Sequence, residues 1–228
     1  MLTLQDVCRS YGKTKALTDF SYTFDRGVYG LLGPNGSGKT TLMNILSDNL
    51  RADSGTVTWN GNTPHRAPIG YAPQDCEMYP SMTAYDFLRY MAVLKACGGA
   101  ETMRQIEELL CYFALHDVKH DRIGTFSGGM KRRLLLIQAF LGNPALVLLD
   151  EPTAGLDPTQ RALVHRLIAK QAKERTVLYA THILPDLGDL CGEVLFLKHG
   201  RLIHVSHTGD DLEHLYAELF GGAHADTL

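Results

Sequence analysis

The stretch Gly33-Pro34-Asn35-Gly36-Ser37-Gly38-Lys39-Thr40 has the G-x-x-x-x-G-K-[ST] pattern of a phosphate-binding loop. Glycines let the backbone wrap closely around a phosphate, with its N–H groups pointing inward. Lys39 is placed to reach β- and γ-phosphates, and the Thr40 hydroxyl is a ligand for Mg²⁺. An apolar run, residues 28–32, precedes the loop, and residues 39–47 have the periodicity of a helix. The sequence therefore predicts a phosphate site between a strand and a helix.

Outward from this loop the chain has the pattern of an α/β fold. Two strand-like segments, residues 2–8 and 16–24, precede the loop, and residues 56–59 follow it before an Asn-Gly turn, which favours an antiparallel β subdomain. From residue 145 strands and helices alternate, which predicts a mostly parallel sheet covered by helices. The predicted elements there are strands 145–149, 176–180, 194–197 and 202–205 and helices 159–173 and 184–190.

The middle of the chain has helical periodicity instead. Thr83 is a plausible N-cap for a helix with apolar residues at 84, 87, 88, 91 and 94, and a second apolar stripe runs from 103 to 113. We expect a helical subdomain, approximately residues 82–140, inserted into the α/β core of a single domain spanning residues 1–228.

The composition is that of an ordinary globular chain. Of 228 residues, 22 are Lys or Arg and 25 are Asp or Glu, so the net charge is −3. This balance argues against a general polyanion binder, although not against a local phosphate site. No apolar run reaches the roughly 18–20 residues of a membrane span, and the five cysteines form no C-x-x-C pair. We therefore expect a cytosolic protein with reduced thiols, whose role at a membrane would come through a partner.

Two acids end a predicted buried strand. Residues 145–151 read Ala-Leu-Val-Leu-Leu-Asp-Glu, which delivers Asp150 to the carboxyl edge of the sheet, where α/β proteins bind ligands. Asp150 can hold Mg²⁺, and Glu151 can polarise a water for in-line attack on a γ-phosphate.

A second anion-binding helix start lies in the middle of the chain. Ser127 stands at an N-cap position, and Gly128 and Gly129 leave the N–H groups of the first turn exposed. One nucleotide does not need two such sites from one chain. The simplest interpretation is that each serves a nucleotide held by a different copy.

Together and in this order, the motifs resemble the ATP-binding cassette subunit of an ABC transporter, from about residue 2 to residue 210. Residues 33–40 match the Walker A loop, residues 146–151 the Walker B strand with its glutamate, and residues 126–130 the signature motif. Gln74 matches the Q-loop, residues 155–157 the D-loop, and His182 the switch histidine.

The resemblance implies ATP and Mg²⁺ as cofactors, and it assigns an expected role to each matching residue. The residues expected to bind Mg²⁺ are Thr40, Gln74 and Asp150. Those expected to take part in catalysis are Lys39, Gln74, Glu151 and His182. The residues expected to contact the nucleotide are Tyr11, Gly33, Pro34, Asn35, Gly36, Ser37, Gly38, Lys39, Thr40, Thr41, Ser127, Gly128, Gly129 and Asp157. Alternatives remain for four of these residues: a strand-end aromatic for Tyr11, an exposed loop amide for Gln74, an ordinary loop histidine for His182 and a helix-start acid for Asp157.

The signature departs from the usual L-S-G-G-Q at both ends, with Phe126 and Met130. The Met form, followed by Lys-Arg-Arg-Leu, resembles the branch whose permeases are exporters. Tyr79-Pro80 and residues 94–98 resemble that branch too.

The resemblance also implies partners. We expect a second cassette, as a homodimer or with a related chain, and a separate transmembrane permease that holds the protein at the inner face of the cell membrane. Met78 and Tyr79 are candidates for the docking surface, with core packing as the alternative. A soluble ABC ATPase acting on ribosomes, RNA or DNA is disfavoured by the negative net charge and the absence of sustained heptads. A non-hydrolysing regulator is disfavoured by Glu151.

Overall fold

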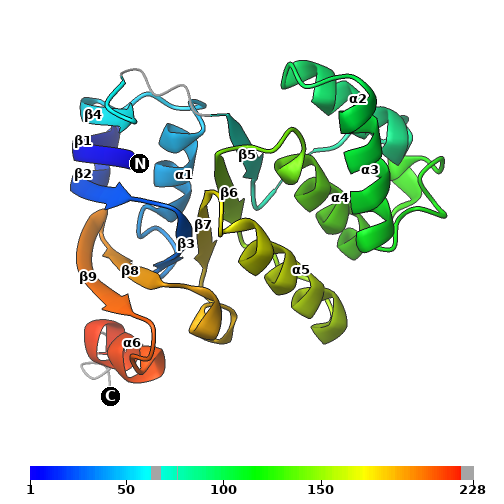
Figure 1. The fold of residues 1–228 in the computed structure, drawn as a ribbon. Helices are drawn as coiled ribbons and strands as arrows, with labels where there is room; N and C mark the ends of the chain where they lie inside the picture. Colours follow the sequence, from blue (N-terminus) through cyan, green and yellow to red (C-terminus); the bar gives the residue numbers. More distant parts are fainter. Residues whose placement is uncertain (63–67, 76, 222–228) are drawn as a thin grey trace.

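Two β-sheets and a lateral group of helices make up the computed structural model, which describes residues 1–62, 68–75 and 77–221 (Figure 1). Cys76 and residues 222–228, which the predicted domain includes, lie outside the described residues. Among the helices that are described, none combines the length and the hydrophobicity needed to cross a bilayer.

The smaller sheet is antiparallel, as the sequence predicts, with strand order β2-β1-β4. Its strands are β1 (Leu2–Tyr11), β2 (Thr14–Phe24) and β4 (Ser54–Trp59). Alternate side chains such as Leu4, Phe20 and Phe24 are buried, because one face of the sheet covers the core and the other meets solvent.

The larger sheet has the order β5-β6-β7-β3-β8-β9 and is parallel except for β9, which pairs antiparallel with β8. Its strands are β3 (Gly27–Leu32), β5 (Ile69–Ala72), β6 (Leu146–Asp150), β7 (Thr176–Thr181), β8 (Glu193–Lys198) and β9 (Arg201–His207). The parallel strands place the loops that follow β3, β5, β6 and β7 at one edge of the sheet.

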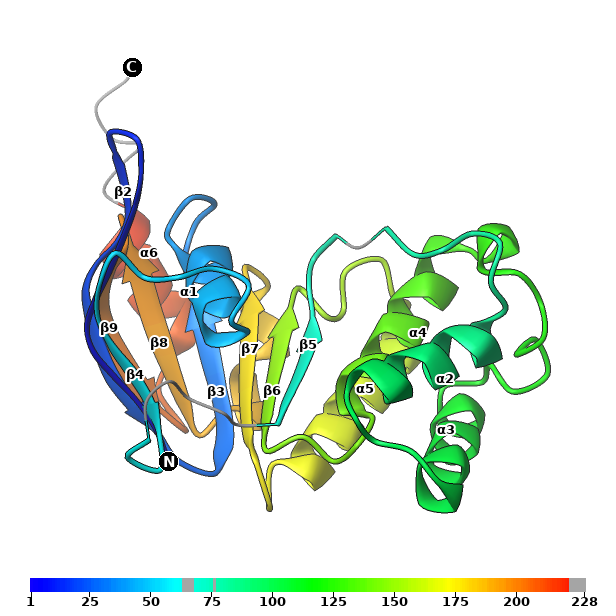
Figure 2. The same ribbon diagram turned by 90° about the horizontal axis from the view of Figure 1, so that it is seen from above.

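The α1 helix (Lys39–Leu46) lies between the two sheets (Figure 2). Its side chains Leu42, Met43 and Leu46 pack in one core with apolar residues of both sheets. This packing fixes the amino end of α1, and therefore the loop before it, against the carboxyl end of β3.

The α5 helix (Pro158–Gln171) covers the other face of the large sheet, where Val164, Leu167 and Ile168 join a second core. That core continues into the lateral group of helices, α2 (Ala84–Leu94), α3 (Ala100–Tyr112) and α4 (Gly128–Phe140). A short 3₁₀ helix, Ile123–Thr125, precedes α4, and α6 (Leu212–Phe220) lies near β8, where the Phe220 and Phe196 rings stack.

Two details differ from the sequence prediction. The segment predicted as one helix over 184–190 is instead two 3₁₀ helices, Leu184–Asp186 and Gly188–Leu190, because the buried Asp186 accepts hydrogen bonds from Thr153 and Tyr179 and turns the chain inward. Strand β5 was not predicted, because it has only four residues and contains Gly70. A Cβ on Gly70 would lie 1.7 Å from the carbonyl oxygen of Ala139, so this strand needs a glycine to let α4 approach.

Candidate functional site

The glycine-rich loop joins β3 to α1, and its geometry requires glycine at the helix start. Gly38 is the N-cap of α1 and has a φ of 110°, and a Cβ there would lie 2.6 Å from the carbonyl oxygen of Ala16. The loop can therefore hold its N–H groups toward the helix axis, where the positive end of α1 attracts an anion.

Lys39 folds back over this loop. Its Nζ donates to the carbonyl oxygens of Gly33, at 2.6 Å, and Pro34, at 3.3 Å, and the residue is only 7% exposed. Burial lowers the pKa of Lys39, while the charges of Glu151 and Asp150 oppose that shift. The lysine is thus held at the loop, in the position from which a phosphate oxygen could replace its carbonyl partners.

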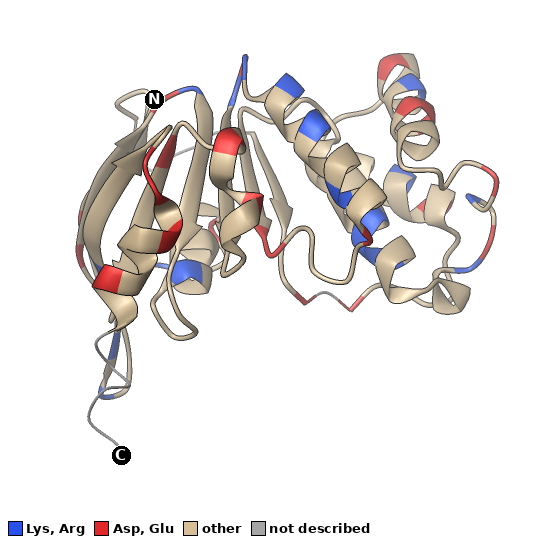
Figure 3. Ribbon diagram, turned by 90° about the horizontal axis from the view of Figure 1, so that it is seen from below, with Lys and Arg blue, Asp and Glu red and all other residues tan. Residues whose placement is uncertain are grey.

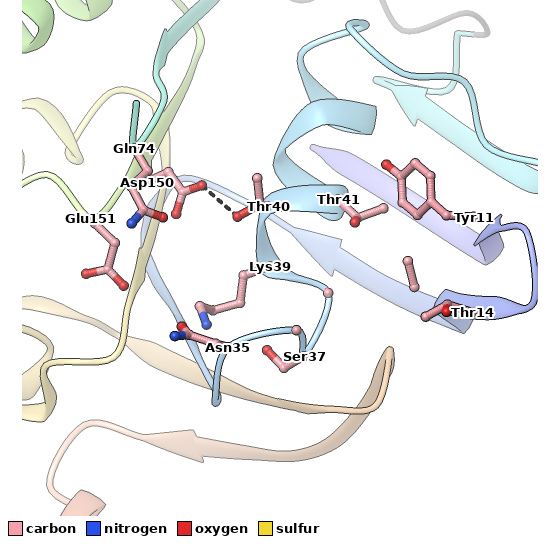
Figure 4. Close-up of a pocket in the computed structure, with 13 residues that line it drawn as sticks. Tyr11, Thr14, Asn35, Ser37, Lys39, Thr40, Thr41, Gln74, Asp150 and Glu151 are labelled. Atoms are coloured by element: carbon pink, nitrogen blue, oxygen red, sulfur yellow. Dashed lines mark hydrogen bonds between the residues drawn. The ribbon is translucent and has the colours of Figure 1, made fainter. Parts of the chain in front are cut away.

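Thr40 and Asp150 meet across the site (Figure 4). The Thr40 hydroxyl donates to Asp150 Oδ2 at 3.0 Å, and Asp150 is 1% exposed. Burial raises the pKa of Asp150, against the hydrogen bond from Thr40 and the charge of Lys39. A hydroxyl oxygen and a buried carboxylate are the oxygen ligands that Mg²⁺ prefers, and a divalent cation would offset the cost of keeping Asp150 ionised. The residues therefore fit a magnesium ion.

Glu151 is fixed by the end of the neighbouring strand β7. Its backbone has a φ of 49°, which turns the chain sharply after β6. Oε2 accepts from the Thr181 hydroxyl at 2.9 Å, and Oε1 accepts from the His182 backbone N–H at 3.0 Å. His182 Nδ1 lies 2.7 Å from the same Oε1, although the His182 side chain itself is 61% exposed. Strand β7 thus holds the carboxylate and the imidazole together.

These groups surround a cavity of about 230 Å³ (Figure 4). The cavity is lined by Tyr11, Thr14, Ala16, Asn35, Gly36, Ser37, Gly38, Lys39, Thr40, Thr41, Gln74, Asp150 and Glu151. Of the residues predicted from the sequence, the structure thus brings Tyr11, residues 35–41, Gln74, Asp150 and Glu151 to one place. Gly33 and Pro34 contribute the carbonyls that hold Lys39, and His182 reaches the site through Glu151.

The structure does not bring the second predicted anion site to this cavity. Gly128 and Gly129 line a separate hollow of about 300 Å³, together with Gln74 and Gly155. Ser127 Oγ accepts from the Met130 N–H at 3.3 Å, which makes it the N-cap of α4. Asp157 caps α5 in the same way, through the Gln160 N–H at 2.9 Å, in agreement with the helix-start alternative.

Three residues near the site were not found from the sequence. Thr14 and Ala16 line the cavity from the start of β2, and Arg132 lies behind it, bonded to the carbonyls of Asp150 and Glu151. Small residues at a strand end carry no sequence signal, and an arginine that binds only backbone has no partner whose identity would indicate it.

A third hollow, of about 400 Å³, lies between β5 and the lateral helices. Tyr71, Tyr79, Phe87, Met91 and Lys95 are among the residues that line it. Tyr79 is 52% exposed and its ring meets that of Tyr90 edge to face. Met78 is half-buried against the core and lines the hollow beside Gly128 and Gly129 instead.

Comparison with known proteins gives a family match. The model of the ABC transporter family matches residues 17–154, which include the glycine-rich loop, Gln74, Ser127 and the two acids at the end of β6.

Individual relatives agree with that match. The chain is 38% identical to the ABC transporter ATP-binding protein YxlF of Bacillus subtilis (strain 168), over 89% of this chain and 69% of that protein. It is 34% identical to a Nod factor export ATP-binding protein I of Cupriavidus pinatubonensis, over 89% of this chain and 65% of that protein. Its fold is similar to a solved ATP-binding subunit of an ABC transporter, with a TM-score of 0.89 at 28% identity over 96% of this chain and 99% of the other.

Proposed function

The chain belongs to the ABC transporter family as an ATP-binding ATPase cassette, and from that premise we propose that two cassettes share two ATP molecules and drive export through a separate permease. The proposal of a shared site rests on one observation: two helix starts of the same chain, each suited to binding an anion, lie apart from each other. The loop before α1 and the first residues of α4, Gly128 and Gly129, line different hollows of the same chain. Each ATP would lie between the loop of one copy and Ser127, Gly128 and Gly129 of the other, an arrangement that a two-fold dimer satisfies.

Positioning and charge would account for the chemistry of the site. Lys39 would exchange its backbone acceptors for phosphate oxygens, and the loop N–H groups would hold the phosphate chain. Tyr11, half-exposed at the end of β1, would stack on the base, with Arg9 at 5.2 Å from its ring centroid. Mg²⁺, held by Thr40, Asp150 and Gln74, would neutralise phosphate charge when bound.

Glu151 is the group we assign to the attacking water. Its carboxylate borders the cavity while Thr181 and His182 fix both of its oxygens, so it can accept a proton from a water without reorienting. His182 lies exposed beside it and would contact the γ-phosphate. Asp157, at the start of α5, would lie at the interface between copies.

We propose that the permease docks in the hollow between β5 and the lateral helices. These helices make up the predicted helical subdomain of approximately residues 82–140. Tyr79, which lines this hollow, and Tyr90, whose ring meets that of Tyr79, are exposed aromatic residues. Such docking would hold the chain at the inner face of the cell membrane. Export, and not import, is supported by the Met130 form of the signature and by the Nod factor export relative.

A role on nucleic acid finds less support in the charge distribution. Lys and Arg gather along α4 and α5, where no Asp or Glu occurs (Figure 3). However, Arg132 is buried, and Arg161 lies 3.4 Å from the buried Asp186 carboxylate. This row is therefore partly committed to internal partners, and the net charge of −3 offers no long-range attraction for a polyanion.

The test is recovery of tagged Glu151→Gln protein, with ATP, from detergent-solubilised native membranes, followed by mass spectrometry. The matched control is Lys39→Ala, which should not hold ATP. We expect a polytopic membrane protein with the first variant and less of it with the second. Ribosomal or other soluble partners alone would favour a soluble ABC ATPase.

A further inference from the structure

Arg132 is a buried arginine, 7% exposed, whose donors all reach backbone carbonyls. A guanidinium has five N–H donors in a fixed plane. Nη1 donates to two acceptors at 2.8 and 3.0 Å, Nε to a third at 3.4 Å, and Nη2 to the remaining two. The acceptors, in chain order, are the carbonyl oxygens of Pro73, Gln74, Asp150, Glu151 and Pro152.

These carbonyls lie where the pairing of β5 with β6 stops. The parallel register of the two strands ends at Ala72 opposite Leu149. Pro73 has no N–H to continue the ladder, so the two chains part immediately before the residues that border the cavity. Arg132 bridges the two chains beyond that point through their backbone carbonyls, of which the Glu151 carbonyl also accepts the Ala154 N–H at 3.2 Å.

The helix that carries Arg132 is itself seated on β5. The Gln138 side-chain amide donates to the Tyr71 carbonyl, and the Ala139 carbonyl approaches so closely that Gly70 has no room for a Cβ. Two side chains of α4 therefore bind consecutive stretches of backbone, Gln138 within β5 and Arg132 directly after it. This packing holds α4 in place and therefore fixes the backbone position from which the Arg132 side chain extends.

The geometry points to Arg132 as a positioning residue for ATP hydrolysis, one that holds the Gln74 backbone at a set distance from the backbone of Asp150 and Glu151. The inference rests on the proposed function, in which those three side chains act on Mg²⁺ and the attacking water. Lys39 and its loop are not among the partners of Arg132. Its loss is therefore expected to impair turnover and to spare the binding of the phosphate chain.

The test compares Arg132→Lys and Arg132→Gln with the wild type. Lysine keeps the charge but has three donors on one nitrogen, and glutamine has two, so neither can hold five carbonyls in a plane. We expect both variants to bind ATP in EDTA within about threefold of the wild type. We expect kcat to fall on the order of 10- to 100-fold, because small misplacements of catalytic groups cost that much. The Mg²⁺ concentration for half-maximal activity should rise as well.

The control is Arg175→Lys. Arg175 is also buried, 8% exposed, but it precedes β7 at the opposite end of the sheet and binds none of these carbonyls. The Arg175→Lys substitution should lower the melting temperature while leaving kcat within about twofold of the wild type. This control separates the effect of losing a buried arginine from the effect of losing the positioning of catalytic groups.

A second measurement separates positioning from general stability. In the Glu151→Gln background, Arg132→Lys should lower the residual rate by a smaller factor than it lowers kcat of the wild type, because one of the three groups that Arg132 positions has lost its carboxylate. A wild-type kcat in both Arg132 variants would overturn the inference and leave the proposed function standing. Failure of Arg132→Lys to fold, or loss of its ATP binding in EDTA, would assign the residue to the fold alone and overturn the inference too. Absence of Mg²⁺-dependent hydrolysis by the wild type would instead count against the proposed function.

Discussion

The carboxylate of Asp150 lies in surroundings that disfavour its ionised form. It is almost fully buried, and its near neighbours are the Thr40 hydroxyl, the Lys39 ammonium and the Glu151 carboxylate. Burial raises its pKa, and Glu151 adds to the shift, so an additional positive charge would stabilise the ionised form. This is the physical reason to expect that Asp150 serves a cation.

Asp150→Asn keeps the shape of the side chain and removes its charge. We expect Mg²⁺-dependent hydrolysis to fall by at least about 100-fold, because the cation loses its charged ligand. ATP affinity in EDTA should stay within about threefold, because Lys39 and the loop are intact. Titration calorimetry and phosphate release measure the two quantities, with Asp117→Asn, on an exposed carboxylate, as the control. Equal Mg²⁺ dependence in the variant and the wild type would refute the metal role.

The residues near the site differ in how far the sequence could reveal them. Residues 33–40 and Asp150 belong to patterns in which spacing and residue type are both dictated by phosphate and metal. Thr14, Ala16 and Arg132 offer no such pattern, because their contacts are to a cavity wall or to backbone carbonyls. Its partners lie 18 to 59 residues away along the sequence, so only folding brings Arg132 into contact with them.

Strands and helices also differ in how far the sequence reveals them. The parallel α/β alternation and the helical middle follow from hydrophobic periodicity, whereas β5 is too short to show one. Strand β5 forms by pairing with β6, and it is held by the contact of Gly70 with α4 and by the bond that Gln138 donates to Tyr71. Arg132 binds the backbone directly after the strand, at Pro73 and Gln74. These are tertiary interactions, which local sequence does not encode.

Gly70→Ala tests the contact between β5 and α4. The added Cβ would lie 1.7 Å from the Ala139 carbonyl, so the helix has to move away from the strand. We expect a loss of unfolding free energy of about 2 kcal/mol or more. Gly98→Ala is the matched control, since nothing lies within 4 Å of its Cβ. Urea unfolding measures both, and equal stability of the two variants would contradict the packing described for α4.

Lys95 joins the end of α2 to the last turn of α4 and gives this junction a pH dependence. Its Nζ donates to the carbonyls of Gln138 and Ala139, and burial lowers its pKa from 10.5 to about 8. Between these values the unfolded chain binds the proton and the folded chain does not. The folded state is therefore penalised below about pH 8, and it gains stability as the pH rises toward 10.5.

The comparison with Lys95→Met isolates that gain. From about pH 7 to about pH 9.5, the unfolding free energy of the wild type should rise relative to the variant by roughly 1–2 kcal/mol. Lys170→Met removes an exposed lysine and should show no such trend. Parallel pH profiles for the wild type and Lys95→Met would show that Lys95 is not desolvated in the folded protein.

The molecule as a whole presents two separate hollows, each beside the start of a helix. The loop before α1 borders one hollow, and Gly128 and Gly129 border the other, with Gln74 on the edge of both. A nucleotide bound by one chain alone would leave the α4 cap without a role. The central claim is therefore that a second copy of the chain completes the ATP-binding site.

Sedimentation velocity of the Glu151→Gln variant with Mg²⁺-ATP tests this claim most directly. The substitution keeps the shape of the side chain but removes the proton acceptor, so ATP should persist and hold two copies together. We predict a dimer with ATP and a monomer without it. Adding Ser127→Arg should restore the monomer while ATP binding remains. A monomer under all conditions, or a dimer that Ser127→Arg leaves intact, would contradict the shared site.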